Sequence, residues 1–216
     1  RVLEELVKRY SSADGIILDQ EKVWGPCHCK YTSVSFQKMM GKEISRAGLL
    51  EFGEYWSRRN ANHFQKVKKR VHKIAPHMKI GVTVEALTLE LFDNGLTGFG
   101  FSWYNHQTTD ADFIHWQRID QSFQAAHYIL NGYCNYGPTW VMLDPTSADA
   151  GWDKNYWGWI PRTPQSIKEE IDFVCNVKNE LEHPENLMGI TEFPISRLPL
   201  NHPNLKATLE YLGERD

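Results

Sequence analysis

The sequence predicts an α/β protein whose strands pair in parallel, and two features of the chain carry that prediction. Five short apolar runs of strand length mostly alternate with longer segments whose apolar residues recur at helical spacing. Four of the five runs end on Asp or Glu. The chain has 216 residues, 41% of them hydrophobic, so it can bury a sizeable core. We expect one domain spanning residues 1–216.

The first strand is the stretch against which the others are compared. Gly15, followed by three large apolar residues, predicts a strand that is buried on both faces. An amphipathic helix over residues 1–10 leads directly into it. Asp19 and Glu21 follow the strand, at the end where parallel α/β folds hold their active sites. The alternative interpretation is that Asp19 only turns the chain after a core strand.

The remaining elements follow in order along the chain. A long loop over residues 22–48 contains a short helix near 36–40, and Pro76 ends the clearest helix, at 49–75. We expect the basic residues of that helix to form its solvated face. The later strands are predicted at residues 79–85, 98–106, 139–145 and 187–194. The later helices are predicted at residues 112–131, 164–181 and 205–212.

Acidic and aromatic residues gather at the predicted strand ends. The acids that end strands are Asp19, Glu85, Asp144 and Glu192. The third run instead ends on Trp103, Tyr104, Asn105 and His106. The loop after the fourth strand adds Trp152, Trp157 and Trp159. In a closed barrel of parallel strands all of these ends would converge on one face, so the pattern predicts a single bowl of acids and aromatic rings.

Several motifs of the first half resemble glycoside hydrolases that fold as (β/α)8 TIM-type barrels, of the β-galactosidase-like and related glycosidase groups. They are the stretch from Asp14 to Asp19, a long loop with Cys27 and Cys29, and a basic helix that opens with Tyr55-Trp56-Ser57-Arg58-Arg59 and ends at Ala75-Pro76. In those barrels a D-G-I-x-x-D strand is the fourth of eight. The resemblance therefore implies strands four to eight, with strands one to three missing from this chain.

The resemblance covers most of the chain as an order of elements, and its motifs are short. Many barrels of this kind carry an Asn-Glu pair at the end of strand four, whereas this chain has Asp19-Gln20-Glu21. The acid/base role is therefore not carried over from the motif. A chain that supplies only five strands would expose sheet edges and a core face, so we expect it to need its missing portion or a partner chain for stability.

The chemistry of these residue types fits glycoside hydrolysis without reference to any family. That reaction needs one carboxylic acid and one carboxylate on either side of the scissile bond, with pKa values that are pushed apart. We expect Asp19 to act with Glu85 or Asp144 as the catalytic pair. Glu21 and Glu192, with Asn105 and His106, are expected to bind sugar hydroxyls. The rings expected to stack on sugar faces are Trp103, Tyr104, Trp152, Trp157 and Trp159.

Two other classes stay open: a catalytically inactive barrel that binds carbohydrate, and a metal-dependent hydrolase on the same fold. No cofactor and no metal site is predicted, because Cys27-His28-Cys29 lacks further ligands that the sequence can identify. No nucleic-acid partner is expected, since 24 basic and 27 acidic residues give a net charge of −3. No apolar run is long enough to span a membrane. The sequence assigns no compartment, and secretion is compatible with it.

Overall fold

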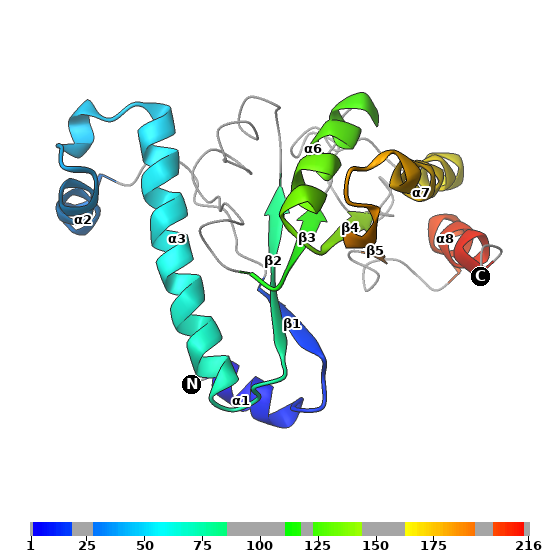
Figure 1. Cartoon of the computed structure of the whole chain (residues 1–216), viewed down its shortest axis with the longest axis horizontal. Helices are drawn as coiled ribbons and strands as arrows, with labels where there is room; N and C mark the ends of the chain where they lie inside the picture. The colour runs from blue at the N-terminus through cyan, green and yellow to red at the C-terminus, as the bar shows by residue number, and fades with distance from the viewer. Residues whose placement is uncertain are drawn as a thin grey trace. The chain divides into compact units, whose positions relative to one another are not determined.

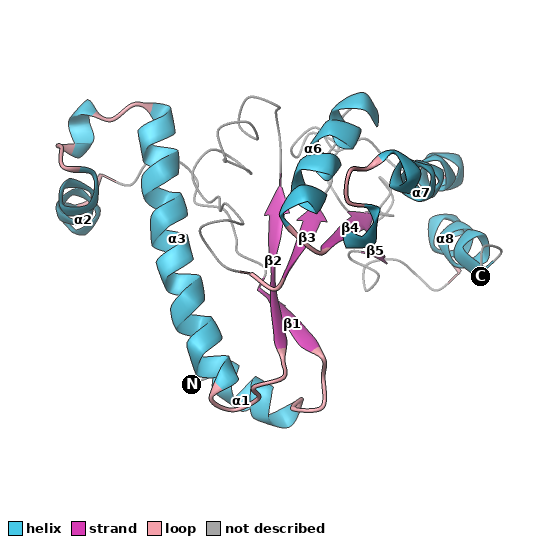
Figure 2. Ribbon diagram, in the orientation of Figure 1, coloured by secondary structure: helices cyan, strands magenta, loops and turns pink. Residues whose placement is uncertain are grey.

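Five parallel strands form one sheet in the computed structural model, which describes residues 2–18, 28–85, 111–117, 123–143, 163–192 and 201–213. The strands lie in chain order in the sheet, as Figure 1 labels them. They are β1 (Gly15–Leu18), β2 (Lys79–Glu85), β3 (Phe113–Gln117), β4 (Thr139–Leu143) and β5 (Leu187–Glu192). The prediction of an α/β protein with a parallel sheet is confirmed, and Figure 2 shows the described helices and strands by colour.

The third strand lies elsewhere than the sequence predicted. The run at residues 98–106 is outside the described residues, and the strand beside β2 is β3, which lies within the helix predicted at residues 112–131. That helix prediction is wrong over Phe113–Gln117, and α6 begins only at Phe123. The physical reason is that Phe-Ile-His-Trp packs as a short strand, while no Gly or Pro between it and α6 marks where the strand ends.

The chain divides into two compact units, of which the first is Arg1–Ile114. Its long helix α3 (Leu49–His72) packs differently along its length. The first half lies against α2 (Lys30–Met40) and the short helix η1 (Ile44–Arg46), while α1 (Val2–Arg9) lies by the last turns, as Figure 1 shows. The second half buries Phe64 and Val71, at the helical spacing read from the sequence.

Helix α2 is longer than the predicted helix at 36–40 because it shares a separate aromatic cluster with α3. The buried members of the cluster are Phe36, Ile44, Phe52, Tyr55 and Trp56. The Phe36 ring centroid lies 5.3 Å from that of Phe52 and 5.1 Å from that of Tyr55. Gly41 ends α2 with a φ of 75°, a left-handed conformation that glycine adopts without steric cost.

Strand β1 is more exposed than predicted. It pairs with β2 in parallel, from Gly15 opposite Lys79 to Leu18 opposite Val82. The prediction of a strand buried on both faces is wrong for β1, because Ile17 is 43% exposed and the other three residues are half-buried. As the first strand in the sheet order, β1 lies at the edge of the described sheet.

The second unit, His115–Asp216, holds β4, β5 and three helices. These are α6 (Phe123–Tyr136), α7 (Pro164–Val177) and α8 (Pro203–Gly213), with the short helices η3 (Lys178–Glu180) and η4 (Pro184–Asn186) between α7 and β5. The Thr163 hydroxyl caps α7 by accepting from the Ser166 N–H at 3.1 Å, and Pro164 occupies the first turn. The apolar face of α7 is buried through Ile167, Ile171 and Val174.

A bulge interrupts the pairing of β4 with β5 near its start. Thr139 pairs with Leu187, but Trp140 pairs with Gly189. Gly189 has a φ of 144°, and a Cβ there would lie 3.0 Å from the Trp140 ring. Glycine therefore permits both the bulge and the close approach of this ring.

Asp112 ties β2 and α3 to the start of β3, and we predict that its loss destabilises the first unit. Its carboxylate accepts from the Ile80 N–H and from Lys68 Nζ, each at 2.8 Å, and the Lys68 side chain is only 16% exposed. Asp112→Ala leaves both donors without this acceptor, so the free energy of unfolding should fall by about 1–3 kcal/mol in urea denaturation.

The matched control is Glu43→Ala, which removes a carboxylate from an exposed pair with Arg46 at 3.6 Å. Such a pair contributes little, so the control should change stability by less than about 0.5 kcal/mol. Equal effects of the two substitutions would contradict the role given to Asp112.

Candidate functional site

Most residues of the predicted site lie outside the described residues. These are Asp19, Glu21, Trp103, Tyr104, Asn105, His106, Asp144, Trp152, Trp157 and Trp159. Glu85 and Glu192 are the last residues of β2 and β5. The assignment of these residues to one site therefore stays a prediction, and what the structure adds is the course of the strands that lead to them.

The strands end where the acidic residues occur in the sequence. Strand β1 ends at Leu18, immediately before Asp19, and β2 ends on Glu85. Strand β4 ends at Leu143, immediately before Asp144, and β5 ends on Glu192. Because the strands are parallel, their carboxyl ends belong to the same edge of the sheet.

A buried histidine that sequence reasoning missed lies in β3. His115 is 7% exposed, and its Nε2 lies 2.5 Å from Thr191 Oγ1 of β5. His115 falls within the helix that the sequence predicts at residues 112–131, and that prediction is wrong here because His115 is a buried strand residue. The signal that could have found it is the run Phe113-Ile114-His115-Trp116, whose aromatic and β-branched residues favour a strand.

His115 and Trp116 lie on opposite faces of β3, because successive strand residues alternate. Trp116 is fully buried on the side of α6, where its ring centroid lies 6.2 Å from that of Tyr133. His115 therefore lies on the face of the sheet away from α6. Thr191 shares that face, and the register places Met142 of β4 opposite Thr191.

The contact between His115 and Thr191 spans two strand spacings, since β4 lies between β3 and β5. Neighbouring strands are about 4.8 Å apart, so β3 and β5 would be roughly 10 Å apart in a flat sheet. Side chains stand nearly perpendicular to a sheet, and they meet at 2.5 Å only if the sheet curves toward this face. We therefore describe the face that bears His115, Met142 and Thr191 as concave.

Burial sets the protonation state of His115. It lowers the pKa of the imidazole from its ordinary value of 6.5 to about 4, because the charged form loses its hydration. The ring is therefore neutral at pH 7, with one nitrogen that donates and one that accepts. Such a group can orient a hydroxyl or a carboxyl group on the concave face, and it supplies no positive charge there at neutral pH.

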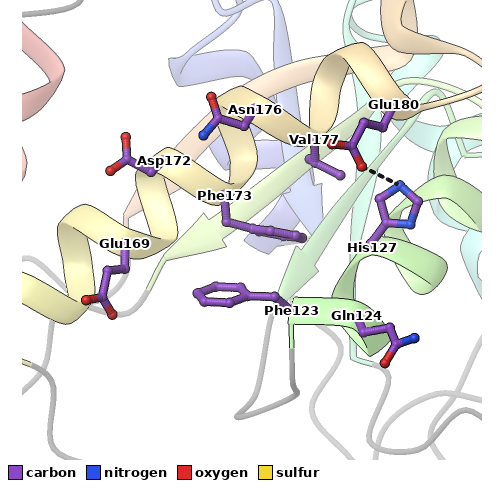
Figure 3. Close-up of a pocket in the computed structure, with 9 residues that line it drawn as sticks. All are labelled: Phe123, Gln124, His127, Glu169, Asp172, Phe173, Asn176, Val177 and Glu180. Atoms are coloured by element: carbon purple, nitrogen blue, oxygen red, sulfur yellow. Dashed lines mark ion pairs between the residues drawn. The ribbon is translucent and has the colours of Figure 1, made fainter.

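A separate groove of about 570 Å³ lies between α6, α7 and η3. Figure 3 shows the Phe123 and Phe173 rings facing each other in it, and their centroids are 5.0 Å apart. His127 Nε2 lies 3.7 Å from a Glu180 carboxylate oxygen, and Asp172 accepts the Tyr211 hydroxyl at 2.7 Å. The groove belongs to the helices and not to the strand ends, and its charged groups are engaged within the fold.

No group of three His, Cys, Asp or Glu side chains that could hold a metal ion occurs among the described residues. Of the triplet weighed as metal ligands, Cys27 lies outside them. Cys29 is exposed, with its Sγ 3.4 Å from Thr32 Oγ1, and the His28 ring packs edge-on against Phe52 at 5.6 Å.

The chain matches no protein-family model, and a comparison with curated proteins gives no match either. Of the helices that the structure describes, none combines the length and the apolar character needed to cross a membrane. What the structure contributes to the candidate site is the neutral His115 beside Thr191, and the acids that follow the strands come from the sequence.

The depressed pKa of His115 predicts a specific loss of stability in mild acid. Below about pH 6.5 the unfolded chain binds a proton that the folded chain does not bind until the pH falls to about 4. The free energy of unfolding should therefore decrease over this window, by up to about 3 kcal/mol from this one group.

Replacement of His115 by Gln, which keeps a hydrogen-bonding side chain, should remove this part of the pH dependence. The measurement is urea unfolding of both proteins from pH 7 to pH 4. Identical slopes against pH for the two proteins would show that His115 does not carry the effect.

Proposed function

We propose that this protein is a glycoside hydrolase that cleaves an oligo- or polysaccharide with a pair of carboxyl groups at the carboxyl ends of its strands. One observation carries the proposal: four of the five parallel strands end on an acidic residue or immediately before one. Glycosidases need two carboxyl groups held a few ångströms apart, and the edge shared by parallel strand ends is where such groups are brought together.

A TIM-type barrel is the architecture that we propose for the sheet. The strands follow one another in chain order, as in a singly wound barrel, whereas a doubly wound sheet changes direction at a switch point. The His115–Thr191 pair supports the proposal because the interior layers of such barrels are built from alternate strands, and β3 and β5 alternate around β4. We assign the strands to positions four to eight on the sequence resemblance alone.

Asp19 remains our first choice for the catalytic pair, with Glu85 or Asp144 as its partner. One of the two would be protonated as the general acid, and the other would be ionised as nucleophile or base. Carboxyl groups about 5–5.5 Å apart would retain the anomeric configuration, and groups about 6.5–9.5 Å apart would invert it. The neutral His115 would orient a hydroxyl or a carboxyl group on the concave face.

Asp144 stands as a possible partner of Asp19 from the sequence alone, where it ends the predicted fourth strand. For Glu192 we keep the role of binding a sugar hydroxyl, as for Glu21.

The proposed aromatic contacts come from residues before and after β3 in the chain. Trp103 and Tyr104, with Trp152, Trp157 and Trp159, would stack on the apolar faces of sugar rings. Asn105 and His106 would bond the hydroxyl groups. Because the third strand is β3, the proposed role of Trp103, Tyr104, Asn105 and His106 no longer rests on a position at a strand end.

The proposal predicts that single amide substitutions abolish hydrolysis. Asp19→Asn, and one of Glu85→Gln or Asp144→Asn, should lower kcat/KM by about 10²–10⁴-fold, because each removes a proton-transfer group or the nucleophile. The assay follows release of the chromophore from a panel of aryl glycosides and release of reducing ends from polysaccharides. The matched control is Glu210→Gln, an exposed acid on α8, which should leave kcat/KM unchanged.

Three outcomes would contradict the proposal. Sugar binding without hydrolysis of any substrate would identify an inactive carbohydrate-binding barrel. Activity that is lost on exhaustive chelation and restored by a divalent ion would identify a metal-dependent hydrolase. Hydrolysis that survives all three amide substitutions would exclude these carboxyl groups as catalysts.

A further inference from the structure

We propose that the outward face of α3 is a binding surface for an acidic polysaccharide, one that bears sulfate or carboxylate groups. This inference rests on the proposed function, because it names the class of polysaccharide that the enzyme would meet. The surface is a stripe of six exposed cations, which we call the basic stripe: Arg58, Arg59, Lys66, Lys69, Arg70 and Lys73.

The charged residues in this part of α3 are all basic. Among the sixteen residues from Arg58 to Lys73, seven are Lys or Arg and none is Asp or Glu. At 3.6 residues per turn, the six cations of the basic stripe fall within an arc of about 120° and extend over about 22 Å along the axis. Phe64 and Val71 are buried on the opposite side of the helix, so the stripe faces away from them, and Arg70 lies at its border beside Glu4 of α1.

Ion pairing distinguishes the basic stripe from Lys68, the seventh cation of this segment. Lys68 points elsewhere and pairs with Asp112 at 2.8 Å. Within the described ranges, none of Lys66, Lys69, Arg70 and Lys73 forms an ion pair with a carboxylate. Arg58 pairs with Glu54, one turn earlier, and the Arg58 side chain is still 52% exposed.

The arrangement costs helix stability, which is a reason to look for a ligand. Lys66 and Arg70, like Lys69 and Lys73, are four residues apart, and like charges at this spacing repel each other. The helix dipole favours cations only in the last turn, so it accounts for Lys69, Arg70 and Lys73 but not for Arg58, Arg59 or Lys66. A chain of anions along the stripe would relieve the repulsion over its whole length.

The shape of the stripe favours a linear polyanion over a membrane or a nucleic acid. The stripe is one helix wide, and its exposed residues are polar, so it offers no apolar side chain for insertion between lipids. It also offers no exposed aromatic ring on which a base could stack. Repeated sulfate or carboxylate groups can engage the guanidinium groups by paired hydrogen bonds and the lysines as point charges.

The test is binding of two acidic glycans, sulfated heparin and the polyuronate polygalacturonate, with neutral dextran for comparison. The variant replaces Lys66, Lys69, Arg70 and Lys73 together by Gln, which keeps a good helix former at each position. We expect its affinity for at least one acidic glycan to fall by about tenfold or more, with a shallower dependence on salt concentration. Circular dichroism establishes whether α3 remains folded in the variant.

The matched control changes the same number of charges at exposed lysines on four other elements: Lys8, Lys38, Lys178 and Lys206, each to Gln. It should bind the acidic glycans as the unchanged protein does. An equal loss in both variants would reduce the effect to net charge and overturn the proposal. Failure to bind either acidic glycan, or tighter binding to duplex DNA than to both, would also overturn it.

This binding test is separable from the test of hydrolysis. Asp19→Asn should leave glycan binding to the basic stripe unchanged, because the stripe does not include the proposed catalytic groups. Binding without hydrolysis would therefore refute the proposed function alone, and hydrolysis of only neutral glycans without binding to the stripe would refute this inference alone.

Discussion

Parallel pairing of the strands is the constraint on which the rest of the structure depends. Each connection must return the chain from the carboxyl end of one strand to the amino end of the next, and a helix is the usual way to do so. Helices α3, α6 and α7 lie on such connections between strands. Within the second unit, α7 packs against β4 and β5, and acids follow these strands in the sequence.

The contact of His115 with Thr191 brings two polar side chains of the parallel sheet together on one face. A flat sheet would hold β3 and β5 too far apart for the two side chains to meet, so the contact reports curvature. Burial then keeps the imidazole neutral, since a charged ring would lose its hydration. A polar group held without charge on a concave face is suited to orient other polar groups.

Helix α3 meets three different environments. Its first half packs with α2 through an aromatic cluster, its second half buries Phe64 and Val71, and its remaining face carries the basic stripe. The helix propensity of these residues permits a helix here. Packing stabilises its full length, because the first half contacts α2 and the last turns contact α1. Asp112 fixes the second half by joining Lys68 to the backbone of β2.

The sequence by itself determined the parallel α/β class, four of the five strands and the main helices. Apolar periodicity carries this information locally, as in Ile80–Val84 of β2 and the buried residues of α7. It also supplied the acids that follow the strands. It misassigned β3, because Phe-Ile-His-Trp has apolar residues at spacings that suit a helix or a strand, and pairing with β2 decides between them.

Only the tertiary structure decided which residues share a face and what lies beside them. The exposure of Ile17 depends on β1 being at the edge of the described sheet, and the burial of His115 depends on curvature that brings β5 close to β3. The basic residues of α3 were visible in the sequence, but the division between Lys68, which pairs with Asp112, and the exposed stripe was not. Contacts between residues far apart in the chain fix these properties, and no local pattern encodes them.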